Sequence, residues 1–233
     1  MARITRKELK SDKFALEVEH TVTFFEEHQK ELIRYGGAAI ALVVLIVGYN
    51  FYSNSQHAKR EDALARAIQL QEAPVGPPTP GQNFNFPTQD SKDQAALKAF
   101  ADVQSKFPGS EEAEIAEYYI GCIKADEGKL QEAQKSFSEV SARGSKNYAS
   151  LAKLSLAQIS FAEGRNDQGE SILRDLMNSP TIFVSKEQAG IALARGIMKA
   201  KPVEARRLLD PLRSIQGPVG QEALQLIAEL PPG

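Results

Sequence analysis

The 233-residue chain carries 28 basic and 30 acidic side chains, so it has little net charge and no basic surface that would indicate nucleic acid as a partner. It contains no Trp, and its single cysteine, Cys122, excludes a disulfide within the chain. Ala, Leu, Glu, Lys and Gln are abundant, and alternating β-branched runs are absent outside one apolar segment. This composition predicts an all-α fold.

The first predicted helix covers Asp12 to Arg34 and precedes the apolar segment. Apolar side chains recur along it at roughly helical spacing: Phe14, Val18, Val22, Phe25 and Leu32. Three alternatives remain open for this tail. It is a helix on a membrane surface, a helix docked on a membrane partner, or a disordered segment.

The apolar run from Tyr35 to Tyr52 is the most informative segment, because it has no charged residue and only one strongly polar residue, Asn50. A helix of this length rises about 27 Å, close to the roughly 30 Å hydrocarbon core of a bilayer. A cleaved signal peptide would have a shorter leader and a small-residue cleavage site, and a buried core helix would carry polar residues every third or fourth position. We therefore expect a tail at 1–34 and a transmembrane helix at 35–52.

Basic residues on the two sides of this segment give its expected orientation. Seven precede it and three lie in 53–72, which places the amino terminus in the cytoplasm by the positive-inside rule. Counting only about 20 residues on each side gives two against three, which decides nothing. We favour a cytoplasmic tail, with the large domain on the other side of the membrane.

Residues 53–90 are expected to hold a helix followed by a long loop. Ser55 to Glu72 is predicted as the helix, and 73–87 contains five Pro and two Gly, which forbid one. We expect 55–72 to pair across this loop with a helix over 91–107. The alternative is a flexible tether between the membrane and the rest of the chain.

From residue 91 onward, three sets of positions recur with spacings of 37, 36 and 36 residues. Within each unit they follow a small, large, apolar pattern at i, i+4 and i+7, which is one face of a helix. The sets are Ala96, Ala133, Gly169 and Ala205; Phe100, Phe137, Leu173 and Leu209; and Val103, Val140, Leu176 and Leu212. Partner helices are predicted at 111–127, 148–163 and 186–199, capping boxes at Ser91–Gln94 and Ser185–Gln188, and a closing helix at 221–230.

The second unit resembles the tetratricopeptide repeat, whose motif has Leu-Gly in the first helix, Gly at the turn, and then Ala and a large residue. The matching residues are Ile120, Gly121, Gly128, Ala133 and Phe137. The next unit keeps Gly164 but has Gly169 and Leu173 where Ala and an aromatic are usual, and the fourth keeps only Ala205 and Leu209. Over 91–233 the resemblance implies an α-solenoid of tetratricopeptide-like helical hairpins, which follows the single transmembrane helix.

Residue patterns that carry catalysis are missing from the sequence. No Cys, His or carboxylate cluster has metal-ligand spacing, and no nucleophile elbow or phosphate-binding loop is present. Cys122 is interpreted as a packed small residue, and Glu111, Glu112 and Glu114 as acidic side chains that favour a helix start. We expect no enzyme activity, no cofactor, no metal and no small-molecule substrate.

The remaining expectation is a surface that binds other proteins. Stacked helix pairs form a groove lined by the first helix of each pair. Counting along those helices gives these candidates to face the groove: Tyr118, Cys122, Asp126, Leu154, Gln158, Phe161, Ala194 and Met198. The alternative for each is that it fills the core. The equivalent positions hold no Asn/Lys set of the kind with which some tetratricopeptide domains grip a peptide carboxyl terminus.

A tail, one anchor and degenerate repeats together resemble the ancillary subunit family of the SecYEG translocon (YfgM-like). Phe24-Phe25 and Gln29-Lys30 are similar to that family's tail, whereas the Pro-rich segment 73–87 departs from it. The resemblance implies a bacterial inner-membrane protein with a periplasmic repeat domain, which assists secreted or envelope proteins beside the translocon. Its implied partners are the translocon, chaperones and unfolded clients. The alternative function is a structural scaffold of a cell-envelope assembly complex.

Overall fold

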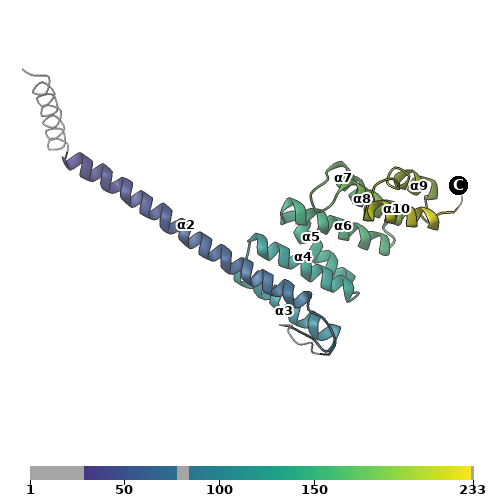
Figure 1. The fold of residues 1–233 in the computed structure, drawn as a ribbon, viewed down its shortest axis with the longest axis horizontal. Helices are drawn as coiled ribbons and strands as arrows, with labels where there is room; N and C mark the ends of the chain where they lie inside the picture. Colours follow the sequence, from purple (N-terminus) through teal and green to yellow (C-terminus); the bar gives the residue numbers. More distant parts are fainter. Residues whose placement is uncertain (1–28, 78–83, 232–233) are drawn as a thin grey trace, which may run out of the picture. The chain divides into compact units, whose positions relative to one another are not determined.

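The computed structural model describes residues 29–77 and 84–231. Within these ranges the chain is helical, and its extended pairing is limited to an isolated bridge between Val75 and Phe86 (Figure 1). The helices are α2 (Gln29–Gln71), α3 (Gln89–Lys106), α4 (Glu111–Asp126), α5 (Leu130–Arg143), α6 (Lys146–Ala162), α7 (Asn166–Asn178), α8 (Lys186–Ile197), α9 (Pro202–Leu209) and α10 (Pro218–Glu229). The predicted all-α class is confirmed.

The chain divides into two compact units, Met1–Ala58 and Lys59–Gly233. The first unit contains the apolar segment of α2. The tail helix predicted from Asp12 lies, up to residue 28, outside the described residues.

Every side chain from Arg34 to Tyr52 is exposed, so the apolar segment has no protein cover among the described residues. Leu45 is 72% exposed and Phe51 78%. Asn50 satisfies its amide within the helix, because its Nδ2 donates to the carbonyl of Ile46 at 2.9 Å. By length and composition, this helix can cross a membrane.

The helices expected at 35–52 and 55–72 belong to one continuous helix. α2 runs from Gln29 to Gln71 without interruption. The physical reason is that neither Gly nor Pro occurs between Tyr49 and Glu72, so nothing there stops the helix.

The first hairpin of the second unit consists of 59–71 in α2 and the whole of α3. Leu64 and Ala67 pack in one buried cluster with Ala96, Phe100 and Val103. The predicted pairing across the Pro-rich loop is therefore confirmed for the part of 55–72 that belongs to this unit.

Backbone hydrogen bonds close the described ends of that loop. The N–H of Gly76 donates to the Phe86 carbonyl at 2.9 Å, and the N–H of Phe86 donates to the Pro74 carbonyl at 3.2 Å. These bonds hold the end of α2 and the start of α3 near each other, as a hairpin requires.

Two capping boxes were predicted, and one of them is wrong. Ser185 and Gln188 form the box that begins α8. α3 instead begins one turn earlier than expected, because Thr88 has extended backbone dihedrals (φ −141°, ψ 156°) and forms the box with Ser91.

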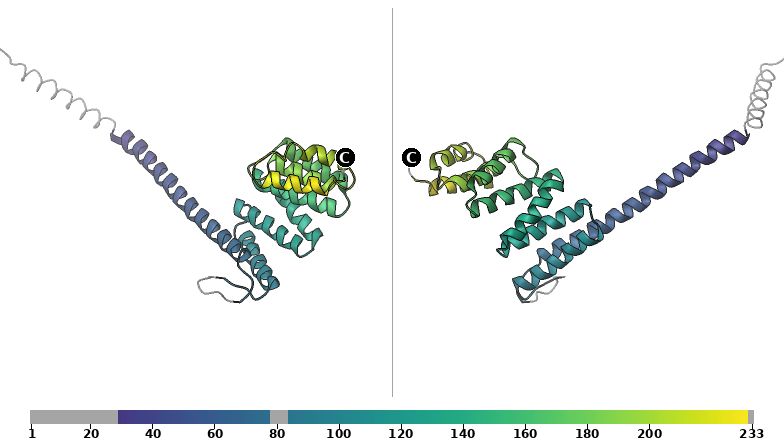
Figure 2. Two further views of the ribbon diagram at one scale, coloured as in Figure 1. Left: turned by 45° about the vertical axis from the view of Figure 1, so that its right-hand side comes forward. Right: turned by 180° about the vertical axis from the view of Figure 1, so that it is seen from behind.

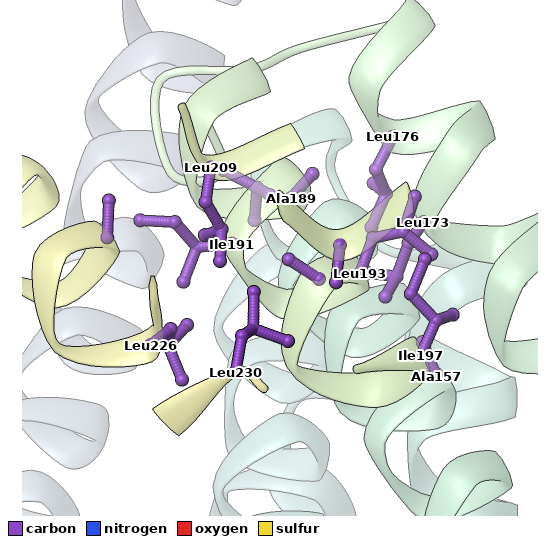
Figure 3. Packing of buried hydrophobic residues seen from close by; sticks show 14 residues of the cluster. Ala157, Leu173, Leu176, Ala189, Ile191, Leu193, Ile197, Leu209, Leu226 and Leu230 are labelled. Carbon is purple, nitrogen blue, oxygen red and sulfur yellow. The ribbon is translucent and has the colours of Figure 1, made fainter. Parts of the chain in front are cut away.

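The repeat positions form the core of the hairpins α4–α5, α6–α7 and α8–α9 as well as of the first one. The large residues are completely buried: Phe100 is 0% exposed, Phe137 1%, Leu173 0% and Leu209 0%. The small residues of the repeat, Ala96, Ala133, Gly169 and Ala205, are all buried. Of the apolar residues three positions after the large ones, Val103, Val140 and Leu176 are buried and Leu212 is half-buried. The predicted repeat is thus confirmed as the pattern of core residues, and Figure 3 shows Leu173, Leu176 and Leu209 among them.

The turns inside two hairpins use glycine for its conformational freedom. Gly128 has φ 75° and Gly164 has φ 76°. These left-handed values are unfavourable for residues with a Cβ, and they end the first helix of each hairpin. Both glycines were predicted at these turns.

Successive hairpins pack mainly through the second helix of one against the first helix of the next, α5 against α6 and α7 against α8, and their first helices, α4 with α6 and α6 with α8, touch less extensively (Figure 2). Long side chains bridge the second helices. Arg165 Nη2 donates to Gln134 Oε1 at 3.1 Å, and Lys201 Nζ donates to Glu170 Oε2 at 2.8 Å. The two bridges lie one repeat apart, so the same contact is used twice.

The predicted closing helix is α10, which begins at Pro218 and packs on both α8 and α9. Leu226 and Leu230 join the buried cluster that contains Ile191 and Leu209 (Figure 3). α10 therefore covers the last repeat as a further first helix would.

Candidate protein-binding groove

A pocket of about 310 Å³ opens between the carboxyl-terminal halves of α4 and α6, with α5 beside it. Its apolar lining is Ala125, Leu130, Phe137, Ile159 and Ala162, and its polar lining is Cys122, Asp126, Ser155 and Gln158. Asp126 and Gln158 are exposed, whereas Cys122 and Ser155 are half-buried. The pocket thus combines an apolar lining with two exposed polar side chains.

The packing of α4 on α5 explains why Cys122 and Asp126 face this space. Gly121 and Ile123 are buried, and a Cβ added at Gly121 would lie only 2.8 Å from the Phe137 ring. The side of α4 that carries Gly121 therefore packs closely on α5. Cys122 and Asp126 are four residues apart, so they lie on one adjacent face of the helix, and this face lines the groove.

Three polar side chains of the two first helices lie close together. The Tyr118 hydroxyl is near the Cys122 thiol and the side chain of Ser155. Burial is the main reason that the pKa of the Tyr118 hydroxyl is raised. Burial also raises the pKa of the Cys122 thiol, and the charge of Asp126 adds to this, while the nearby Tyr118 hydroxyl opposes it. A thiol with a raised pKa is a poor nucleophile at neutral pH, which supports the packed-residue interpretation.

The ring of Tyr118 belongs to a row of aromatic side chains that crosses the repeats. Its centroid lies 5.8 Å from that of Tyr119 and 5.6 Å from that of Tyr148. Tyr119 stacks on Phe100 at 5.1 Å, and Tyr148 meets Phe183 edge-on at 5.3 Å. Spacings of this kind are favourable for aromatic pairs, so the row ties three repeats together and fixes Tyr118 in place.

The predicted groove residues farther along the chain have different surroundings. Leu154, Phe161 and Met198 are half-buried and pack against the carboxyl-terminal core. The Phe161 ring occupies the space beside two glycines, since a Cβ at Gly196 would lie 2.5 Å from it and one at Gly169 would lie 2.8 Å away. Phe161 therefore joins α6 to α7 and α8.

Ala194 was predicted to face the groove, and this placement is wrong. It is 0% exposed and lies in the cluster that includes Ala223 and Leu226 of α10. The physical reason is that α10 packs on α8, so this position has no surface to offer a partner. The open groove accordingly lies along α4 and α6.

Three of the eight predicted residues thus come together at one pocket: Cys122, Asp126 and Gln158. Residues that sequence reasoning missed complete it, among them Ser155, Ile159 and Leu130. Ser155 and Ile159 lie next to counted positions, so a wider face of each first helix would have included them. Leu130 belongs to a second helix, and only the three-dimensional packing reveals its position at the pocket.

Acidic side chains at the start of α4 have structural roles. Glu112 is buried, and its carboxylate lies 3.5 Å from Arg60 Nε of α2. Glu117, one turn further along α4, accepts a hydrogen bond from Gln104 of α3. Within residues 29–77 and 84–231, no group of three or more His, Cys, Asp or Glu side chains could hold a metal ion.

A family model described as tetratricopeptide repeat-like domain matches residues 23–195. No curated protein and no solved structure matches the chain. The matched range covers well over half of the chain and includes the apolar run as well as the hairpins that form the pocket. The chain therefore belongs to the tetratricopeptide repeat-like domain family.

Proposed function

We propose that the protein is a membrane-anchored binding module whose α4–α6 pocket holds segments of unfolded secreted or envelope polypeptides. The observation that carries this proposal is the pocket itself. It has an apolar lining from three helices and lies on the first helices of the solenoid, the face with which such repeats bind other proteins.

The pocket is suited to side chains rather than to a folded surface. A volume of about 310 Å³ is at the small end for ligand sites, so it accommodates a few apolar side chains. Exposed Asp126 and Gln158 offer polar contacts to an adjacent backbone. An extended, unfolded segment presents both kinds of group at once.

The proposed anchor is the apolar part of α2. Its large side chains are exposed all round, as for Ile40 (67%), Leu45 (72%) and Tyr49 (72%). A helix that is apolar on every side requires an apolar environment, and a bilayer supplies it. Anchoring raises the local concentration of the groove near a membrane partner, so weak binding is sufficient.

The location beside the SecYEG translocon rests on the resemblance of the whole layout: a tail, one anchor and degenerate repeats. In this proposal the tail is cytoplasmic, the repeats are periplasmic, and the module hands emerging chains to chaperones. A scaffold role in a cell-envelope assembly complex is the competing interpretation, which the following experiment separates.

The experiment places a photo-crosslinking amino acid at Gln158 in the full-length chain in bacterial cells. Gln168, an exposed glutamine outside the pocket on α7, is the matched control. The proposal predicts that Gln158 captures many different unfolded secreted chains and that Gln168 captures few. Capture of one folded partner at fixed stoichiometry would support the scaffold, and equal capture at both positions would contradict a binding groove at α4–α6.

Orientation is tested separately, with a reporter enzyme that is active only outside the cytoplasm and is fused after Gly233. The proposal predicts an active fusion. A stable fusion without activity would place the repeats in the cytoplasm and would exclude the proposed clients.

A further inference from the structure

We infer that the α4–α6 pocket selects segments in which an apolar side chain lies next to a Lys or Arg, with Asp126 as the group that recognises the cation. This inference rests on the proposed function and specifies the chemistry of the client.

The charged side chains around Asp126 are already paired. Glu127 lies 2.9 Å from Lys129 and 3.4 Å from Lys124, and Lys124 also lies 3.6 Å from Glu132. At the end of α6, Glu163 and Arg165 are 2.5 Å apart. Each of these ion pairs neutralises its own charges within the chain.

Asp126 differs from them, because in the part of the chain that the structure describes no basic side chain pairs with it. It is exposed at the edge of the pocket, and its charge acts on the Cys122 thiol in the same pocket. An unpaired carboxylate beside an apolar cavity gives the site a negative potential, which favours a cation on any ligand that enters.

The position of Asp126 in its helix indicates that this carboxylate does not stabilise the fold. It is the last residue of α4. The carboxyl end of a helix carries partial negative charge, so an acidic side chain there is unfavourable. A residue that opposes the helix dipole and has no ion pair, but lines the pocket, fits a role in recognition.

The occupant is therefore an extended segment with a specific pair of groups. Its apolar side chain contacts Ala125, Leu130 and Ala162, the apolar lining residues that keep exposed surface, and its Lys or Arg approaches Asp126 at the edge. Because that ion pair forms in partly solvated surroundings, we expect it to change binding by about two- to fivefold, the range for exposed pairs.

The test uses the full-length chain in lipid nanodiscs with the photo-crosslinker at Gln158. Three otherwise identical unstructured peptides carry a central Leu followed by Lys, Gln or Glu. We expect cross-linking to decrease in the order Lys, Gln, Glu, with about a two- to fivefold step between Lys and Gln. Asp126→Asn should abolish this order. Asp175→Asn, which removes a carboxylate from an exposed position of α7, should preserve it.

A thermal melt of the two variants separates recognition from folding. Because Asp126 opposes the helix dipole, Asp126→Asn should melt at the same temperature as the unmodified chain or slightly above it. Equal cross-linking of all three peptides would overturn the inference and leave the binding groove intact. A preference for Lys that survives in Asp126→Asn would also overturn it. If none of the peptides cross-links, the proposed function fails together with the inference.

Discussion

Gly121→Ala tests the closest helix approach beside the proposed pocket. A Cβ at this position would lie 2.8, 3.0 and 3.1 Å from three atoms of the Phe137 ring, whereas ordinary contacts begin near 3.4 Å. The ring is 1% exposed and packs with Ala133, Val140 and Ile159, so it cannot move without displacing core residues.

Two opposing effects set the magnitude. Overpacking of a core lowers the free energy of unfolding by about 1–3 kcal/mol. The higher helix propensity of Ala raises it by about 1 kcal/mol. We expect Gly121→Ala to lower the free energy of unfolding by about 1 kcal/mol. The measurement is urea unfolding of the full-length chain in nanodiscs, followed by circular dichroism at 222 nm.

Gly190→Ala is the matched control, because it is also a buried helical glycine. There the nearest atoms to an added Cβ are Met177 Cε at 3.7 Å and Leu212 Cδ1 at 4.0 Å, which are normal contacts. This variant should gain about 0.5–1 kcal/mol from the reduced freedom of the unfolded chain and from helix propensity. If Gly121→Ala stabilises the protein as much as Gly190→Ala does, the α4–α5 packing is not as described. Phe137→Leu should relieve the clash, so the double variant should be more stable than additivity predicts.

Three further predictions concern the core, the caps and the ion pairs. Leu173→Ala, at a completely buried repeat position, should cost about 2–5 kcal/mol in the same unfolding assay, and a loss below 1 kcal/mol would contradict its place in the core. Ser185→Ala should cost about 1 kcal/mol through loss of the α8 cap, whereas Ser185→Asp should retain most of the stability. Lys201, followed by Arg174, lowers the pKa of the Glu170 carboxyl below its ordinary value of 4.5, so these bonds stabilise the fold above pH 4.5 and are lost as the pH falls through the lowered pKa. The stability difference between the unmodified chain and Glu170→Gln should therefore be constant from pH 5 to 8 and shrink in stronger acid, and a difference that persists at pH 2 would refute the ion-pair explanation.

The repeat architecture could be predicted because each hairpin buries the same helix face. Ala133 and Phe137 occupy that face in one unit and Gly169 and Leu173 in the next, so a period of 36 residues is visible even where the tetratricopeptide motif has degenerated. Helix limits were less predictable. Thr88 and Ser91 are both residue types that cap helices, and the sequence does not decide between them, because the choice depends on the backbone conformation of Thr88.

The site could be predicted only in part, because a groove depends on what covers it. Cys122, Asp126 and Gln158 followed from counting along first helices, and the structure brings them to one pocket. Ala194 occupies the equivalent position in the last repeat, but it is buried in the cluster that α10 completes, and the docking of a separate closing helix leaves no periodic signal. Similarly, Gly196 lies 35 residues from Phe161, and nothing local indicates that the glycine makes room for this ring.

Hydrogen exchange of the full-length chain in nanodiscs, with and without an unfolded secretory polypeptide, tests the central claim most directly. We expect slower amide exchange in the carboxyl-terminal turns of α4 and α6, which line the pocket, and unchanged exchange in α9. Protection confined to the second helices, or no protection at a client concentration that cross-links at Gln158, would contradict a binding groove at α4–α6.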